Sequence, residues 1–498
     1  MRVASTIQAM LAAKAFAHTP AVPLSSTLLL ASRCLASVEQ GHSLSEALSK
    51  VPSTQRPAVQ AVTLYAMRHW GKARAWRAMV LKKPTGQPWV DSLIGLALLL
   101  LDVATTPEAA TTDAPLYTPH TLVTQAVDAT RQGRAKPVLP GLLNAVLRRF
   151  QREHVPFVEA IKDDPVAQWG YPMWWQKKLQ TTYPRDWQAI LSVSRQPPRL
   201  VLRVNRRLND VATVQQAFAD QGITAVALGE SAIAVTQAGA VDQLPGYAEG
   251  WWSVQDLGAQ QAAGLLLPVG GQSMSRVLDA CAAPGGKTAH LLESTDINLN
   301  LNLTALDQDP DRLARVADNL SRLRLMHDGV TLKAADARAL DDWWDGQPFD
   351  AILADLPCTG SGVVRRHPDI AWLKRPGDLV KTAQLQKQIL DTLWQTLAPG
   401  GRLLMVTCSV FSEEGEQQAE QFLTRHPDAM RLPAPGQLLP RASTADDPGQ
   451  DGFFYGLFER EGTVSATANQ AKNGTKSQTK NQTKTRNKSQ TTESQYDE

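Results

Sequence analysis

The segment Asp279-Ala-Cys-Ala-Ala-Pro-Gly-Gly-Lys-Thr288 organises the C-terminal half of this 498-residue chain. A short apolar run, 276–279, precedes it and is typical of a buried strand, and a helical pattern opens at Thr288. The two glycines between them, Gly285 and Gly286, let the backbone approach a ligand closely, and the N-terminus of the following helix favours a negative group. The segment therefore predicts the first strand–loop–helix unit of an α/β domain that binds a ligand.

The same alternation of strand and helix patterns continues to residue 407. We expect further strands at 303–306, 330–334, 349–354 and 403–407, with helices at 310–325 and 383–397. This βαβ order predicts a parallel, doubly wound sheet, in which ligands bind outside the carboxyl ends of the strands. The sequence contains no G-x-x-x-x-G-K-[ST] segment, so the phosphate-cradling loop of an ATPase is not expected.

Acidic residues end the second and third expected strands. Asp307 suits the hydroxyl groups of a ribose, as in other nucleotide-binding sheets, and Asp336 is placed to contact an adenine edge. Each aspartate alone is as typical of a helix cap as of a binding site. One aspartate at each strand end, beside the glycine-containing loop, predicts a nucleoside site.

Two cysteines follow the fourth and fifth expected strands. Cys358 lies three residues after Asp355, and Cys408 directly follows the fifth strand. Because neighbouring strands lie about 4.8 Å apart, both thiols would reach the same substrate atom if these strands are adjacent. An isolated cysteine is usually a small buried hydrophobe, which is the plain interpretation of Cys34 and an alternative for Cys281. The pair at the strand ends instead predicts thiol chemistry.

The N-terminal part is predicted to be helical. Apolar residues recur at helical spacing from 24 to 152, with Pro and Gly clusters at 52–57, 83–88 and 105–119. Lys and Arg outnumber Asp and Glu by eight in residues 1–160, whereas acids are in excess in 161–460. This charge indicates either a nucleic-acid contact or a basic solvated helix face. The candidate phosphate ligands are Arg68, Lys72, Arg74, Arg77, Lys82, Lys83, Arg148, Arg149 and Arg152.

The middle of the chain predicts two smaller elements. Residues 165–190 are rich in Trp and Tyr, and we expect the core of a helical linker, with stacking of RNA bases as the alternative. A strand, a helix and two short strands between 200 and 235 then predict a small α+β module. The expected domains are 1–155 (with 1–23 as an extension), 156–265, 266–462 and a disordered polar tail, 463–498.

Composition excludes several classes of protein. With 43% hydrophobic and 20% charged residues, the chain has an ordinary globular composition. Its four cysteines have no C-x-x-C spacing, so neither a disulfide scaffold nor a compact zinc site is expected. The apolar run 93–101 is too short to span a bilayer. A cytoplasmic monomer without a membrane segment or a metal is the expectation.

The motifs together resemble the RNA cytosine-C5 methyltransferases that use S-adenosylmethionine. They are WSVQD (252–256), DACAAPGGKT (279–288), Asp307 within LDQD, Asp336, DLPCTGSG (355–362), RRHPDI (365–370), TCSV (407–410) and DGFFYGLF (451–458). Upstream, GLLNAVLRRF (141–150) resembles the NusB-like domain of the bacterial members that act on 16S rRNA. The resemblance covers roughly 25–460. One departure is Thr359, where the family usually has Ser, and it keeps a hydroxyl.

This resemblance implies a multidomain fold. It consists of an all-α NusB-like N-terminal domain, a small α+β module and an α/β class I, Rossmann-like methyltransferase domain. The implied activity is methyl transfer from S-adenosylmethionine to C5 of a cytosine in 16S rRNA, usually cytosine 967 in this family. The implied RNA partner is unassembled 16S rRNA or a partly assembled small subunit.

The resemblance also assigns roles to individual residues. Cys408 is the nucleophile, Cys358 assists product release, and Asp355 hydrogen-bonds the cytosine. Lys287 either helps to activate Cys408 or orients the base or cosubstrate. The implied cofactor-binding residues are Cys281, Ala282, Ala283, Pro284, Gly285, Gly286, Lys287, Asp307, Asp336 and Asp355.

Three alternatives remain at this point. A DNA cytosine-C5 methyltransferase would use Cys358 as its nucleophile, but the second thiol and the NusB-like region disfavour it. The same chemistry could act on tRNA or on another rRNA cytosine. A non-catalytic rRNA-binding assembly factor would bind the cosubstrate without turnover. Arg365, Arg366 and His367 line the RNA path or form a structural loop, and the sequence favours neither interpretation.

Overall fold

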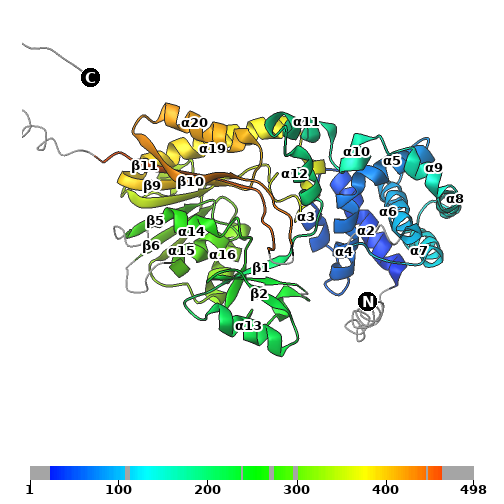
Figure 1. Cartoon of the computed structure of the whole chain (residues 1–498), viewed down its shortest axis with the longest axis horizontal. Coiled ribbons are helices and arrows are strands. Elements are labelled where there is room, and N and C mark those ends of the chain that lie inside the picture. The colour runs from blue at the N-terminus through cyan, green and yellow to red at the C-terminus, as the bar shows by residue number, and fades with distance from the viewer. Residues whose placement is uncertain are drawn as a thin grey trace, which may run out of the picture.

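The computed structural model describes residues 23–106, 113–236, 239–267, 274–294, 301–444 and 447–462. The expected N-terminal extension, apart from its last residue, and the expected tail lie outside these ranges. Figure 1 shows a helical bundle at one end, a large sheet covered by helices at the other, and a small α+β module below. Two helices, α11 (Met173–Thr182) and α12 (Trp187–Ser194), connect the bundle with the rest.

The N-terminal bundle is all-helical, as predicted. Its helices are α2 (Leu24–Glu39), α3 (Leu44–Ser49), α4 (Arg56–Arg68), α5 (Trp70–Val80), α6 (Pro88–Thr105), α7 (Pro119–Gln132), α8 (Leu139–Arg152), α9 (His154–Glu159) and α10 (Pro165–Trp169). Helix α6 is long and apolar enough to cross a membrane, yet two thirds of it (67%) is buried inside the molecule. It packs against α2, α5, α7 and α8, so it is the core helix of the bundle.

The aromatic segment forms a buried cluster on α11 and α12. Tyr171 and Trp175 are both buried, and the ring of Trp175 lies edge-on to Phe411 at 4.9 Å between centroids. Tyr183 donates its hydroxyl to the carbonyl of Val410 at 2.8 Å. These contacts attach the linker to the C-terminal domain. The prediction of a packed helical core is therefore confirmed for Tyr171 and Trp175, because neither ring is free to stack on RNA.

The α+β module is a four-stranded antiparallel sheet with one helix. Its elements are β1 (Leu200–Val204), α13 (Val211–Asp220), β2 (Ala225–Ala227), β3 (Ala232–Val235), a 3-10 turn η2 (Val241–Gln243) and β4 (Trp252–Val254), with the strand order β2-β3-β1-β4. The first four elements match the predicted strand–helix–strand–strand order. Strand β4 was not expected as a strand, because only three residues form it and η2 separates it from β3.

The C-terminal sheet has seven strands in the order β10-β11-β9-β8-β5-β6-β7. They are β5 (Arg276–Ala280), β6 (Asn302–Asp307), β7 (Val330–Ala334), β8 (Phe349–Asp355), β9 (Leu397–Thr407), β10 (Ala429–Leu438) and β11 (Phe453–Arg460). Strands β5 to β9 are parallel, as predicted, but β11 runs antiparallel to β9 and β10. The sheet is therefore mixed, and the expectation of a purely parallel sheet is corrected at this edge.

Helices cover both faces of this sheet (Figure 1). The set α14 (Gln261–Leu266), α15 (Gly286–Ser294) and α16 (Pro310–Arg322) packs on one face, and α17 (Leu340–Trp343), α19 (Pro376–Gln395) and α20 (Glu416–Arg425) pack on the other. A short helix, α18 (Ile370–Leu373), and a 3-10 turn, η3 (Ser412–Glu414), lie near the strand ends. The central strands β5 and β8 are apolar on both faces, which explains their continuous hydrophobic runs.

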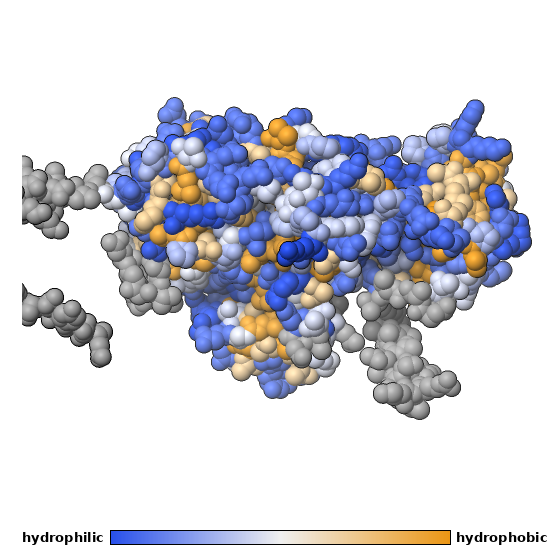
Figure 2. Space-filling view, turned by 45° about the horizontal axis from the view of Figure 1, so that its top comes forward, coloured by the Kyte–Doolittle hydropathy of each residue, from blue (hydrophilic) through white to orange (hydrophobic). Residues whose placement is uncertain are grey.

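The bundle contacts loop 363–375 of the C-terminal domain. The backbone N–H of Leu44 donates to Asp369 Oδ2 at 2.8 Å, and the indole N–H of Trp372 donates to the carbonyl of Met67 at 3.3 Å. Figure 2 shows a largely hydrophilic surface with separate apolar areas over the different parts. The C-terminal domain and the bundle are thus joined by specific polar contacts.

Candidate active site

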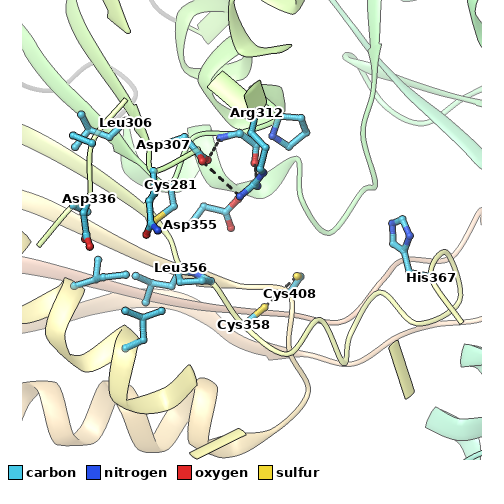
Figure 3. Close-up of a pocket in the computed structure, with 18 residues that line it drawn as sticks. Cys281, Leu306, Asp307, Arg312, Asp336, Asp355, Leu356, Cys358, His367 and Cys408 are labelled. Atoms are coloured by element: carbon cyan, nitrogen blue, oxygen red, sulfur yellow. Dashed lines mark hydrogen bonds and ion pairs between the residues drawn. The ribbon is translucent and has the colours of Figure 1, made fainter. Parts of the chain in front are cut away.

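A cavity of about 520 Å³ opens at the carboxyl ends of the parallel strands (Figure 3). It lies where the strand order of the sheet reverses, because the chain adds β6 on one side of β5 and later adds β8 and β9 on the other side. Ligands in such sheets bind at this switch point. The walls include Cys281, Ala283, Pro284, Leu306, Asp307, Arg312, Asp336, Asp355, Cys358, His367, Leu385, Ile389 and Cys408.

The loop after β5 supplies one wall, but not with all of the expected residues. Cys281, Ala283 and Pro284 face the cavity, whereas Ala282, the two glycines and Lys287 do not line it. Gly285 has a φ of +94°, and a Cβ there would lie 3.1 Å from the side chain of Val316 in α16. A glycine at 285 is therefore required by helix packing, and its contact with a ligand stays a prediction.

Two carboxylates from β6 and the loop after β7 form the opposite wall. Asp307 is 3% exposed and accepts the N–H groups of Ala283 at 3.1 Å and Asp309 at 3.0 Å. Asp336 is bound by the guanidinium of Arg338 at 2.6 Å, and this hydrogen bond holds the pKa of Asp336 below its usual value. Asp336 therefore stays ionised at neutral pH, and both carboxylates have lone pairs for ligand hydroxyl or amino groups.

These walls fit S-adenosylmethionine. Leu306, Leu385 and Ile389 offer an apolar surface for an adenine ring, and Asp307 offers acceptors for ribose hydroxyls. Asp336 offers acceptors for the adenine edge, and Asp355 offers a carboxylate to the cationic methionine end. Among the described residues, no group of three His, Cys, Asp or Glu side chains is arranged to hold a metal ion.

The two thiols meet at the end of the cavity. Strands β8 and β9 are parallel neighbours, as the spacing of the cysteines required. The Sγ atoms of Cys358 and Cys408 lie 3.2 Å apart, within hydrogen-bond distance (Figure 3). The hydrogen bond with Cys408, together with burial, raises the pKa of Cys358 well above its usual value. At neutral pH the thiol of Cys358 therefore keeps its proton.

A buried ion pair stands beside the thiols. Lys287 Nζ lies 2.7 Å from Asp355 Oδ2 and 5.5 Å from the ring centre of Phe453. Burial disfavours the ammonium ion, but the charge of Asp355 outweighs it, so the pKa of Lys287 is raised. Lys287 is therefore charged at neutral pH, and it attracts the thiolate of Cys408, which also favours the ammonium form.

The RRHPDI segment is mostly structural. Arg365 is 3% exposed, and its guanidinium pairs with Asp451 and with Asp256, the latter at 3.1 Å. Arg366 pairs with the same two carboxylates. Of the two interpretations that the sequence left open, the structural loop therefore holds for both arginines, whereas His367 lines the cavity.

Part of the basic N-terminal group is also used inside the molecule. Arg68 is 6% exposed and binds Asp113 Oδ2 at 2.8 Å, and Arg77 pairs with Glu39 at 2.7 Å. Lys72 lies 3.5 Å from Asp102. These three residues were candidate phosphate ligands, but each pairs with a carboxylate inside the molecule. The exposed basic residues of the group include Lys82, Lys83, Arg148, Arg149 and Arg152, and Arg149 pairs with Glu153 at 2.9 Å.

The sequence did not reveal Glu414, which is completely buried and accepts two hydrogen bonds from Thr359. It also did not pair Asp256 with Asp451, because the two are 195 residues apart and neither lies in a periodic pattern. A weak signal existed, since both aspartates lie inside family-like motifs, WSVQD and DGFFYGLF. No such signal marked Glu414.

The strand order and the cavity define a class I S-adenosylmethionine-dependent methyltransferase. A family model described as 16S rRNA methyltransferase RsmB/F matches residues 265–459, and a model of the RsmF/B-like ferredoxin-like domain matches residues 171–242. A solved structure titled "Crystal Structure of PH0851" has a TM-score of 0.69, covers 88% of this chain and 99% of its own, and is 22% identical. At that identity the likeness concerns the fold.

Curated relatives give the more specific result. The ribosomal RNA small subunit methyltransferase B of Pseudomonas putida is 39% identical over 446 residues, which are 86% of this chain and 97% of the relative. The protein of the same name from Vibrio cholerae is 37% identical and covers 85% and 95% of the two chains. The chain therefore belongs to the ribosomal RNA small subunit methyltransferase B family.

Proposed function

We propose that this enzyme methylates C5 of a cytosine in 16S rRNA, with cytosine 967, the usual target of the family it resembles, as the first candidate. The observation that carries the proposal is the 3.2 Å separation of the Cys358 and Cys408 sulfur atoms at the cavity that fits S-adenosylmethionine. C5 of cytosine is a poor nucleophile, and addition of a thiolate to C6 makes it reactive. A second thiol is useful when that covalent bond must later be broken.

Cys408 makes the bond to C6 in this proposal. The ammonium group of Lys287 interacts electrostatically with Cys408, so a positive charge stands beside the attacking sulfur. As the thiolate adds to C6, Asp355 hydrogen-bonds the N3–N4 edge of the cytosine and supports protonation at N3. S-adenosylmethionine, when bound, supplies the methyl group that C5 accepts.

Cys358 acts when the product is released. The C5 proton is lost to water, its electron pair re-forms the C5=C6 double bond, and the C6–S bond breaks. The leaving thiolate of Cys408 is stabilised by a hydrogen bond from the S–H group of Cys358, 3.2 Å away. The raised pKa of Cys358 keeps that proton in place and disfavours the alternative in which Cys358 is the nucleophile, as in DNA cytosine-C5 methyltransferases.

The rest of the chain is proposed to hold the RNA. We take 1–155 and 156–265 as the RNA-positioning regions, 266–462 as the catalytic domain and 463–498 as a polar tail. The target base has to leave any stack to reach the thiols, so a single-stranded region of unassembled rRNA or of a partly assembled small subunit is the proposed substrate. The enzyme is proposed to act as a cytoplasmic monomer.

The test uses purified protein, labelled S-adenosylmethionine and a 16S rRNA transcript, with the methylated base located by bisulfite sequencing. Incorporation at one cytosine of 16S rRNA is the expected result. Incorporation only into tRNA, or at a different rRNA position, would replace the substrate and keep the chemistry. Cosubstrate binding with no incorporation into naked rRNA or into subunit precursors would favour an assembly factor and refute the proposal.

A further inference from the structure

The loop after β8, which carries Cys358, is joined to the loop after β9, which carries Cys408, by several hydrogen bonds. The backbone N–H of Gly362 donates to the carbonyl of Cys408 at 2.9 Å. The hydroxyl groups of Ser361 and Ser409 lie 2.8 Å apart, and both serines are buried. The distance between the two thiols is therefore set by contacts between the loops and not by either loop alone.

Glu414, in η3, forms the strongest of these links. Its Oε1 accepts the backbone N–H of Thr359 at 2.8 Å, and its Oε2 accepts the Thr359 hydroxyl at 2.6 Å. Its backbone carbonyl accepts the hydroxyl of Thr407 at 3.0 Å. One carboxylate thus connects the residue after Cys358 with the end of the loop that begins at Cys408.

Burying the carboxylate of Glu414 costs free energy of desolvation, which a neutral structural link would avoid. Glu414 is 0% exposed, and burial raises its pKa. A neutral hydroxyl pair such as Ser361 and Ser409 joins the same loops without placing a charge in the interior. The negative charge of Glu414 acts on Cys358. The hydrogen bond with Cys408 and burial already raise the pKa of Cys358, and the charge of Glu414 raises it further.

We infer that Glu414 is a positioning residue of this methyltransferase, which fixes the loop of Cys358 and keeps its sulfur as the S–H donor to the sulfur of Cys408. The inference rests on the proposed function and deepens it. Glu414 does not touch the substrate in this scheme. It acts through Cys358, at the step in which the C6–S bond breaks and the electron pair of the C5–H bond re-forms the double bond, with the proton passing to water.

The experiment compares four variants with wild-type protein on 16S rRNA. Glu414→Ala removes the link and the charge, Glu414→Gln removes the charge and keeps a hydrogen-bonding side chain, and Thr359→Val removes one hydrogen bond. Glu413→Gln is the matched control, because the adjacent Glu413 pairs with Lys178 outside the thiol pair. For each variant, multiple-turnover methylation, the amount of covalent protein–RNA adduct on a denaturing gel, and the pH–rate profile are measured.

Glu414→Ala is expected to lower multiple turnover about tenfold or more and to accumulate adduct, while adduct formation in a single turnover changes less than about threefold. Glu414→Gln is expected to move the alkaline limb of the pH–rate profile to lower pH, because Cys358 then ionises more easily. A merely structural residue would change neither adduct accumulation nor this limb. Glu413→Gln should match wild type.

Two results would overturn the inference: normal product release without adduct in Glu414→Ala, or an unchanged alkaline limb in Glu414→Gln. If Glu414→Ala does not fold, as shown by circular dichroism and loss of cosubstrate binding, Glu414→Gln and Thr359→Val decide the question by the same readouts. Failure of wild-type protein to methylate RNA would refute the proposed function itself. Adduct in Cys358→Ala but wild-type behaviour of all Glu414 variants would refute the inference alone.

Discussion

A methyl group added at Gly285 should destabilise the catalytic domain much more than one added at Gly286. At Gly285 an alanine would keep a φ of +94°, which costs about 1–3 kcal/mol for a residue with a Cβ. Its Cβ would also lie 3.1 and 3.2 Å from atoms of the fully buried Val316, and such overpacking costs about 1–3 kcal/mol. The expected loss in the free energy of unfolding is therefore about 2–6 kcal/mol.

Gly286 is the matched control, because it begins α15 and an added Cβ would meet nothing closer than Gln255 Nε2 at 3.9 Å. Alanine is there neutral or stabilising by up to about 1 kcal/mol, since it is the better helix former. Differential scanning calorimetry should show a Tm lower by roughly 4–24 °C for Gly285→Ala, at about 2–4 °C per kcal/mol, and little change for Gly286→Ala. Equal Tm values, or a larger loss at Gly286, would refute the assignment of Gly285 to helix packing.

Cys408→Ala should abolish methylation and leave the affinity for S-adenosylmethionine, measured calorimetrically, largely intact. Cys358→Ala should accumulate a covalent protein–RNA adduct, visible on a denaturing gel. Normal turnover by Cys408→Ala would contradict the mechanism. Arg365→Ala should lower the free energy of unfolding by about 3–5 kcal/mol, because it removes one of the two guanidinium groups that neutralise the buried Asp256 and Asp451, while the exposed Arg148→Ala should change it by less than about 0.5 kcal/mol. Burial raises the pKa of Asp279 to about 7, so its folded form prefers the proton, and its contribution to stability is complete below its usual pKa and is lost as pH rises to about 7. The free energy of unfolding of Asp279→Asn should therefore rise relative to that of wild type between about pH 4 and pH 7. A difference in the free energy of unfolding that does not depend on pH would contradict this.

The sequence predicted the parallel part of the large sheet because the physical signal there is local. Strands β5 and β8 are buried on both faces and therefore consist of nearly continuous apolar residues. Strand β10 lies at the edge of the sheet, alternates only weakly and contains two prolines, so it gave no such signal. The antiparallel β11 was visible only as a family-like motif, without its direction.

The candidate site divides in the same way. The sequence could place Cys358, Cys408 and Asp307 together because each follows the end of a predicted strand. The ends of parallel strands share one edge of the sheet. Lys287 was a candidate beside Cys408, and the structure adds its pairing with Asp355 at 2.7 Å. Glu414 was beyond prediction, because its partner Thr359 is 55 residues away and burial of its charge depends on the completed fold.

The basic residues needed the structure for a different reason. Charge counting places a cation in a region, but it does not say whether a carboxylate is already bound to it. In a count of charged residues, Arg68 and Arg365 are equivalent to the exposed Arg148. In the structure, Arg68 and Arg365 are buried and paired with acidic residues. Contacts between distant segments therefore decide which arginines are available to a phosphate.

The pairing of Arg366 with Asp451 also has a consequence for how the protein is made. The two residues are 85 positions apart, and a ribosome adding about 5–20 residues per second needs roughly 4–17 s to synthesise that stretch. During this interval Arg365 and Arg366 have emerged, with Asp256 as the carboxylate already available to both. The loop 363–375 therefore cannot complete its contacts with Asp451 on the nascent chain until residue 451 has been translated.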